Sequence, residues 1–183
     1  STLSSISVLS GTLSNTETQI NMQKHLQLIG ERTREVITSM DDIVWSVNPR
    51  NDNLTDALDR LKDYGREVLE NQQTRLHFDV SSTAQRLTLS MEQRKAILLI
   101  AKEALHNAAK HALAHDVWIT FDYQGRILHL TVRDNGMGFS LEKIKRGNGL
   151  SNMQARAAKL GGEIHIESET IEGTRIKLEC PIT

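Results

Sequence analysis

The chain has 183 residues, enough for one good hydrophobic core or for a domain with an appendage. Its formal net charge of −1 and sequence pI of about 6.6 give no general basic field, so neither nucleic acid nor an anionic membrane surface is expected as a partner. The single cysteine, Cys180, cannot form an internal disulfide, which fits a reducing, cytoplasmic location, and the apolar runs are too short to span a membrane.

The N-terminal part is predicted to be helical and to carry a dimer interface. An amphipathic helix end is indicated near the N-terminus by Leu3, Ile6, Leu9 and Leu13. From about residue 17 to 47, spacings of three and four alternate in an apolar stripe made of Met22, Leu26, Ile29, Thr33, Val36, Met40, Ile43 and Val47. A 3.5-residue period held this long predicts a coiled-coil or bundle seam buried between chains. A long helix lying on its own domain's core is the alternative.

Pro49 and the polar residues around it predict a domain boundary, with a partial helical hairpin at residues 1–48 and a second domain at residues 49–183. Trp45 is expected to pack at this junction or as an ordinary core residue. In the second domain, periodicity predicts helices at 54–71, 90–113 and 150–160 and strands at 75–80, 117–123, 126–132, 164–168 and 174–180. This order, α-β-α-β-β-α-β-β, predicts an α+β fold, a two-layer sandwich preceded by a long helix.

Asp134 ends one of these strands and begins the sequence Asp-Asn-Gly-Met-Gly. An ionised carboxylate only accepts hydrogen bonds, so at the floor of a pocket it suits an exocyclic amine such as that of adenine. Gly136 and Gly138 allow positive φ and close approach of the backbone to a ligand. The same residues would also make a good hairpin turn, an alternative that this motif alone leaves open.

Two further motifs flank this one. Upstream, Glu103, Asn107, Lys110 and His111 fall at i, i+4, i+7 and i+8, so they share one face of a helix. Downstream, a Gly-x-Gly sequence opens the next helical segment at Gly147. Together and in this order, the three motifs resemble those of the GHKL, or Bergerat-fold, ATPases, which include sensor histidine kinases, type II topoisomerases, Hsp90 and MutL.

The details resemble the histidine kinases of two-component systems. Asn107-x-x-Lys110-His111 is similar to their N box, and the segments 42–49 and 147–162 resemble the branch whose dimerisation helices carry a His-Asp phosphoacceptor pair. In that branch the pair lies shortly before a sequence like Ser1–Ile6. The one literal match here, His115-Asp116, lies between a helix and a strand and is interpreted as a turn. The chain therefore resembles a cytoplasmic fragment that begins just after the acceptor and does not phosphorylate itself.

The resemblance implies that the chain binds ATP and Mg²⁺. Asp134, helped by Thr174, would accept the adenine amine, and Asn107 would be the Mg²⁺ ligand. The catalytic candidates are Lys110, facing phosphate oxygens, and Glu103, acting as a general base or orienting a metal-bound water. A helix N-terminus would bind phosphate, and residues 139–146 would form a lid. The residues expected at the nucleotide are Asn107, Lys110, His111, Asp134, Gly136, Gly138, Phe139, Gly147, Asn148, Gly149, Leu150 and Thr174.

The implied activity is that of a protein histidine kinase, which transfers the γ-phosphate of ATP to a histidine and then to an aspartate of a response regulator receiver domain. The implied assembly is a homodimer through the heptad helix, with no membrane contact in this chain. Two alternatives stay open. A GHKL serine kinase of the anti-sigma class is disfavoured by the long heptad helix, and a nucleotide-binding module without catalysis is disfavoured by the intact motifs.

Overall fold

The chain divides into two compact units, Ser1–Asn48 and Pro49–Thr183. The computed structural model describes Ile29, Thr33 and residues 54–70, 72–140 and 148–182. Ile29 and Thr33 are helical, and the Thr33 hydroxyl donates to the Ile29 carbonyl at 2.8 Å. The rest of the predicted heptad seam, Trp45 and most of the predicted lid lie outside the described residues, so the dimerisation helix and the domain assignment stay predictions.

The described part of the second unit has the predicted order of elements. Its helices are α3 (Leu54–Glu70), α4 (Ser82–Gln85), α5 (Met91–Asn107) and α6 (Asn148–Lys159), with a π-helical turn η2 (Ala108–Ala112) after α5. Its strands are β1 (Arg75–Val80), β2 (Asp116–Gln124), β3 (Ile127–Asp134), β4 (Glu163–Glu169) and β5 (Gly173–Pro181). The short helix α4 replaces a predicted polar loop, because the Ser81 hydroxyl accepts the amide of Ala84 as an N-cap.

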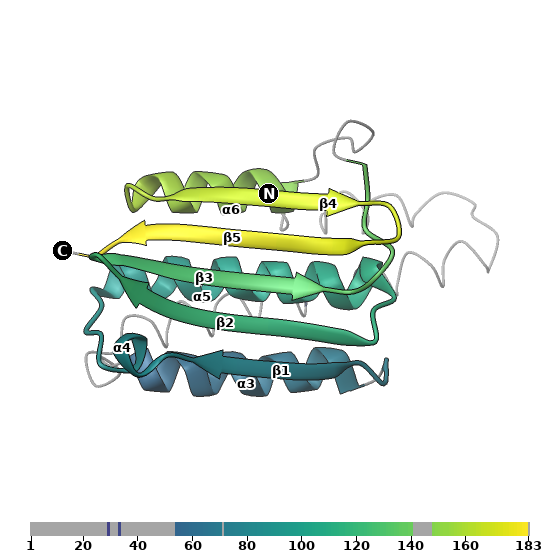
Figure 1. The fold of residues 1–183 in the computed structure, drawn as a ribbon, viewed down its shortest axis with the longest axis horizontal. Coiled ribbons are helices and arrows are strands. Elements are labelled where there is room, and N and C mark those ends of the chain that lie inside the picture. Colours follow the sequence, from purple (N-terminus) through teal and green to yellow (C-terminus); the bar gives the residue numbers. More distant parts are fainter. Residues whose placement is uncertain (1–28, 30–32, 34–53, 71, 141–147, 183) are drawn as a thin grey trace. The chain divides into compact units, whose positions relative to one another are not determined.

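The five strands form one sheet in the order β1-β2-β3-β5-β4, and α3, α5 and α6 pack against the same face of it (Figure 1). This confirms the predicted two-layer α+β sandwich. The pairs β2–β3, β3–β5 and β4–β5 are antiparallel, but β1 pairs with β2 in parallel. A parallel pair needs a crossover connection, and here the chain crosses over through α4 and α5 before it returns to the sheet at β2.

The hydrophobic core lies between the sheet and these helices. Fully buried side chains from both layers include Leu61, Leu69, Leu105, Ile119, Leu130, Met153 and Leu178. Along β3 the buried residues alternate with less buried ones, as expected for a strand with one face on a core. The start of α5 is confirmed as predicted: Ser90 accepts the amide of Gln93, and the Gln93 side chain accepts the amide of Ser90.

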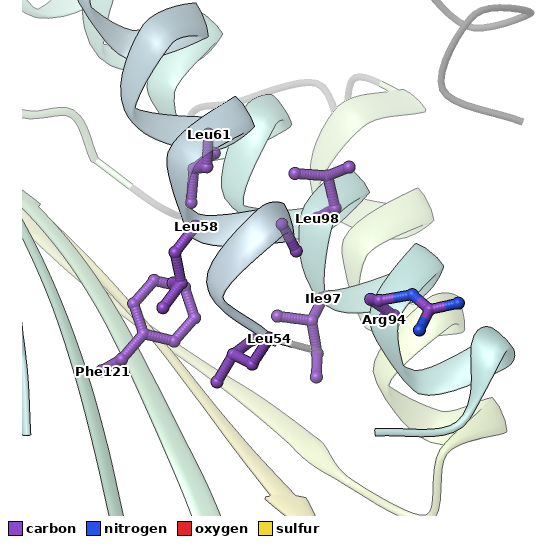
Figure 2. Close-up of a pocket in the computed structure, with 8 residues that line it drawn as sticks. Leu54, Leu58, Leu61, Arg94, Ile97, Leu98 and Phe121 are labelled. Atoms are coloured by element: carbon purple, nitrogen blue, oxygen red, sulfur yellow. The ribbon is translucent and has the colours of Figure 1, made fainter. Parts of the chain in front are cut away.

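The contact between α3 and α5 leaves only a small cavity, of about 10 Å³. It is lined mainly by apolar side chains of Leu54, Leu58, Ile97 and Phe121, and the guanidinium of the buried Arg94 points away from them (Figure 2). A space of this size holds one water at most. This cavity is therefore a packing defect of the core.

Candidate functional site

Asp134 is the last residue of the central strand β3, and only 5% of it is exposed. Its Oδ1 atom accepts the amide of Gly136 at 2.9 Å and the amide of Thr174 at 3.2 Å. Burial raises the pKa of the Asp134 carboxyl above its ordinary value, although these two amides, Arg133 and the Thr174 hydroxyl oppose the shift. A buried acceptor is thus held in a fixed direction by backbone donors.

Backbone hydrogen bonds connect the segment after Asp134 to η2 on one side and to the turn between β4 and β5 on the other. The amide of Met137 donates to the Ala112 carbonyl at 2.7 Å, and the amide of Ile171 donates to the Met137 carbonyl at 2.7 Å. The amide of Phe139 donates to the Ser168 hydroxyl at 2.9 Å. We call residues 134–139 the glycine loop. It does not form a hairpin, because β3 pairs next with β5, so the alternative reading of Asp-Asn-Gly as a hairpin turn is wrong.

The two glycines of the glycine loop are required for different reasons. Gly138 has the expected positive φ, +57°, and a Cβ there would overlap the Glu169 carbonyl. Gly136 has no positive φ, but a Cβ there would overlap the Ala112 carbonyl. Close approach to neighbouring backbone therefore explains both glycines, and the left-handed conformation explains only Gly138.

Thr174 and Ser168 continue the site across the neighbouring strands. Asp134 lies opposite Thr174, and Thr174 lies opposite Ser168, so the three residues form a row across β3, β5 and β4. The hydroxyls of Thr174 and Ser168 are 3.0 Å apart, and the Ser168 hydroxyl donates to the Gly173 carbonyl at 3.2 Å. Ser168 was not predicted. Only the register of β4 on β5 reveals it, and no local motif marks that register.

The helical motif is less regular than predicted. Glu103 and Asn107 lie on the last turns of α5, where the α-helix ends, and Lys110 and His111 lie on η2. The helix predicted to run to about residue 113 is therefore wrong at its end, because π-helical geometry breaks the 3.6-residue period. Lys110 and His111 are exposed. Partial burial, Lys110 and His106 lower the pKa of His111, so its ring is mostly neutral at pH 7.

The start of α6 forms the last part of the candidate site. A Cβ at Gly149 would overlap Oε1 of Glu103, so the glycine lets the carboxylate of α5 approach the N-terminus of α6. Leu150 is half-buried on the same turn. Gly147 and the side chain of Asn148 lie outside the described residues. The structure thus joins η2 to the glycine loop through Ala112, and α5 to α6 through Glu103 and Gly149.

Residues 92–183 match the family model described as "Histidine kinase-, DNA gyrase B-, and HSP90-like ATPase". The chain belongs to this family. A domain of this family uses ATP as its nucleotide. The match confirms the resemblance inferred from the three motifs, and the sandwich with Asp134 at its strand end is the ATPase fold of that family.

Curated relatives of this ATPase domain are named as sensor kinases. The chain is 47% identical over 88 residues to the sensor histidine kinase YdfH of Bacillus subtilis, covering 45% of this chain and 21% of that protein. It is 27% identical over 163 residues to the sensor histidine kinase LiaS of the same organism, covering 87% and 43%. The sensor protein VraS of Staphylococcus haemolyticus is 37% identical over 84 residues, covering 45% and 24%. The chain therefore spans less than half the length of these relatives.

Solved structures share the fold. The histidine kinase AdeS of Acinetobacter baumannii superposes with a TM-score of 0.68 at 14% identity, covering 97% of this chain and 95% of that one. The catalytic domain of the histidine kinase ThkA gives a TM-score of 0.60 at 18% identity, covering 70% and 92%. Among the described residues, no helix is both long enough and apolar enough to cross a membrane.

Proposed function

We propose that this chain is the ATP-binding catalytic part of a two-component sensor histidine kinase. The whole protein would transfer the γ-phosphate of ATP to a histidine, which passes it to an aspartate of a response regulator. The observation that carries the proposal is the buried Asp134 carboxylate, held by two amides at the end of β3 in a domain of the ATPase family. The names of the relatives support the kinase class.

Asp134 recognises the adenine amine in this proposal. Both backbone amides donate to Oδ1, so we assign the second carboxylate oxygen, Oδ2, to the base. The Thr174 hydroxyl, next to the same carboxylate, would bind the base directly or through a water. The base would lie over the backbone of Gly136, Gly138 and Phe139. A carboxylate can only accept, so this arrangement favours an amine at position 6 of the purine over a carbonyl.

The triphosphate would lie between η2 and the start of α6. Lys110 and His111 are exposed on η2 and can face phosphate oxygens. The N-terminus of α6, with Gly147, Asn148, Gly149 and Leu150, supplies amides for the same anion. Glu103 lies against Gly149, which supports a role in orienting a metal-bound water near the phosphates. Mg²⁺ would be shared between these phosphates and Asn107, whose amide oxygen is a hard ligand.

Replacing Asn107 by Ala should weaken ADP binding about tenfold when Mg²⁺ is present, and much less in EDTA, because only the metal-bridged contact is lost. Calorimetric titration of the variant with and without Mg²⁺ measures the difference. Gln154→Ala, which removes an exposed amide on α6, is the matched control and should bind ADP as the unaltered chain does. An equal loss with and without the metal would remove Asn107 from the metal site.

Mixing the chain with γ-labelled ATP and a dimerisation-helix fragment that carries a His-Asp pair should label the fragment. Phosphohistidine is acid-labile, so the label should disappear in acid. Acid-stable label on serine would instead favour the serine kinase of the anti-sigma class, and nucleotide binding without any transfer would favour a binding module. Phosphoryl transfer needs an acceptor histidine in line with the γ-phosphate. The one His-Asp pair in this sequence, His115-Asp116, lies between a helix and a strand of the second domain. The chain alone should therefore incorporate no acid-labile label.

The partners proposed are a second copy of the chain, bound through the stripe from Met22 to Val47, and a response regulator receiver domain. The sensor kinase names of the relatives support both partners in general terms. A dimer should appear in sedimentation experiments at high concentration, and a monomer under those conditions would place the stripe on its own domain instead. A cytoplasmic location fits this assignment.

A further inference from the structure

Asn135, the residue after Asp134, is bonded to the start of β2 through both its side chain and its backbone. Its Oδ1 atom accepts the amides of His115 at 3.0 Å and Asp116 at 2.9 Å. Its Nδ2 atom donates to Oδ2 of Asp116 at 3.3 Å, and its own amide donates to the Asp116 carbonyl at 3.3 Å. His115-Asp116 was interpreted from sequence as a turn between a helix and a strand; His115 does form a bend before β2, and both residues are also bonded to the glycine loop.

Asp116 is in turn held by the edge strand β1. Arg75 donates from Nε to Oδ1 at 2.8 Å and from Nη2 to Oδ2 at 2.9 Å, a two-point contact with the carboxylate. His77 Nε2 lies 2.7 Å from Oδ1. The bonds from Arg75, His77 and Asn135 lower the pKa of Asp116 to about 2, so it is ionised at any physiological pH. The side chain of Arg75 is itself 74% exposed.

These contacts connect directly to the carboxylate that reads the base. Asn135 stands between Asp134 and Gly136, and Gly136 supplies one of the two amides that Oδ1 of Asp134 accepts. The direction of that amide depends on the peptide plane between Asn135 and Gly136. A residue 135 that is fixed by four hydrogen bonds fixes this plane, and the plane fixes the rotation of the Asp134 carboxylate.

We infer that Asn135, Asp116 and Arg75 are positioning residues that set the direction of the Asp134 carboxylate for recognition of the adenine amine. The inference rests on the proposed role of Asp134 in base recognition. It assigns to the edge strand β1 a part in nucleotide selectivity that no local motif marks. Because Arg75 is exposed, its replacement tests the arrangement with little risk to the fold.

Arg75→Gln should lower the preference for ADP over IDP about tenfold, by analogy with the loss found when hydrogen-bond partners of metal ligands are removed. IDP differs from ADP by a carbonyl in place of the 6-amine, so the ratio of the two dissociation constants reports the direction of the Asp134 carboxylate. A role limited to stability would lower the melting temperature and leave this ratio unchanged. Arg66→Gln, which breaks an exposed ion pair with Asp63 on α3, is the matched control.

Asn135→Asp provides a second variant. It keeps an oxygen for the amides of His115 and Asp116 but places a second carboxylate against Asp116, so the ratio should fall at least as far as in Arg75→Gln. Arg75→Lys should restore part of the preference, because an ammonium keeps the charge without the two-point contact.

The variant Asp134→Asn tests base recognition by Asp134 separately from the positioning role of the other residues. If Asp134→Asn abolishes the preference for ADP while Arg75→Gln and Asn135→Asp keep it, the positioning role is wrong and base recognition by Asp134 stands. If Asp134→Asn also keeps the preference, base recognition fails, and the positioning role fails with it.

Discussion

Replacing Asp134 by Asn should weaken ADP binding by about 30- to 150-fold, which corresponds to about 2–3 kcal/mol for the loss of one charged hydrogen-bond partner. The variant keeps the size of the side chain, and its oxygen can still accept the amides of Gly136 and Thr174. What it changes is the atom that would face the base in the proposed complex, because the carboxamide nitrogen donates a hydrogen bond and the 6-amine donates one too. Calorimetric titration with ADP in the presence of Mg²⁺ measures the loss.

The same variant should be more stable than the unaltered chain when no nucleotide is present. Burial raises the pKa of the folded Asp134 carboxyl, so ionisation of this group disfavours the folded state above that pKa. A neutral carboxamide carries no such penalty. The melting temperature of Asp134→Asn should therefore be higher at pH 7, and the advantage should shrink as the pH falls through the raised pKa, where Asp134 takes up a proton.

Asp79→Asn is the control for both measurements, because Asp79 is exposed on β1. It should change neither ADP affinity nor the melting temperature appreciably. Unchanged ADP affinity in Asp134→Asn would remove Asp134 from the site, whatever happens to stability. Lower stability of the nucleotide-free variant at pH 7 would show that the hydrogen bonds to the carboxylate outweigh the cost of burying its charge.

Gly138→Ala should destabilise the domain by about 3 kcal/mol or more, a large share of the 5–15 kcal/mol that holds a typical domain folded. Its φ of +57° is unfavourable for alanine, and the new methyl group would overlap the Glu169 carbonyl. A carbonyl in a β-strand cannot move aside as a flexible side chain can. Relief requires a shift of the glycine loop, so the folded fraction should also bind ADP more weakly. Urea unfolding gives the first quantity and calorimetry the second.

The variant Gly125→Ala separates the cost of a positive φ from the cost of the overlap with the Glu169 carbonyl. Gly125 has nearly the same φ, +58°, but no atom lies within 4 Å of a Cβ placed there. This variant should lose only the conformational term, about 1 kcal/mol, and should bind ADP normally. Equal losses in Gly125→Ala and Gly138→Ala would mean that the close approach to Glu169 contributes nothing.

Much of the fold could be predicted because the hydrophobic pattern is local. The helix predicted at 54–71, the helix start predicted at residue 90 and the strand that ends at Asp134 each depend on neighbours in the chain, and the structure confirms all three. Asp134 and its glycines could be predicted as a candidate site for the same reason, since a strand end, a carboxylate and two glycines lie within five positions.

The parts that could not be predicted depend on which strands lie side by side. Ser168 joins the site only through the register of β4 on β5, and Arg75 reaches Asp116 only because β1 pairs with β2 in parallel. Neither register leaves a trace in local periodicity. The π-helical turn after Asn107 is a different case, because Ala108–Ala112 are as compatible with an α-helix as with the wider turn that the structure adopts.

The parallel pairing of β1 has a consequence for how the domain folds. β2 and β3 are joined by Gly125 and Arg126 alone, both at positive φ, so this hairpin can form early from local contacts. β1 should join later, because its partner strand lies beyond α4 and α5 and this long connection must close before the two strands can pair. Backbone amides of β1 should gain protection from hydrogen exchange later than those of β3 during refolding. The two-point contact of Arg75 with Asp116 would then be among the last contacts to form. A nascent domain would therefore acquire its core before it acquires its selectivity for adenine.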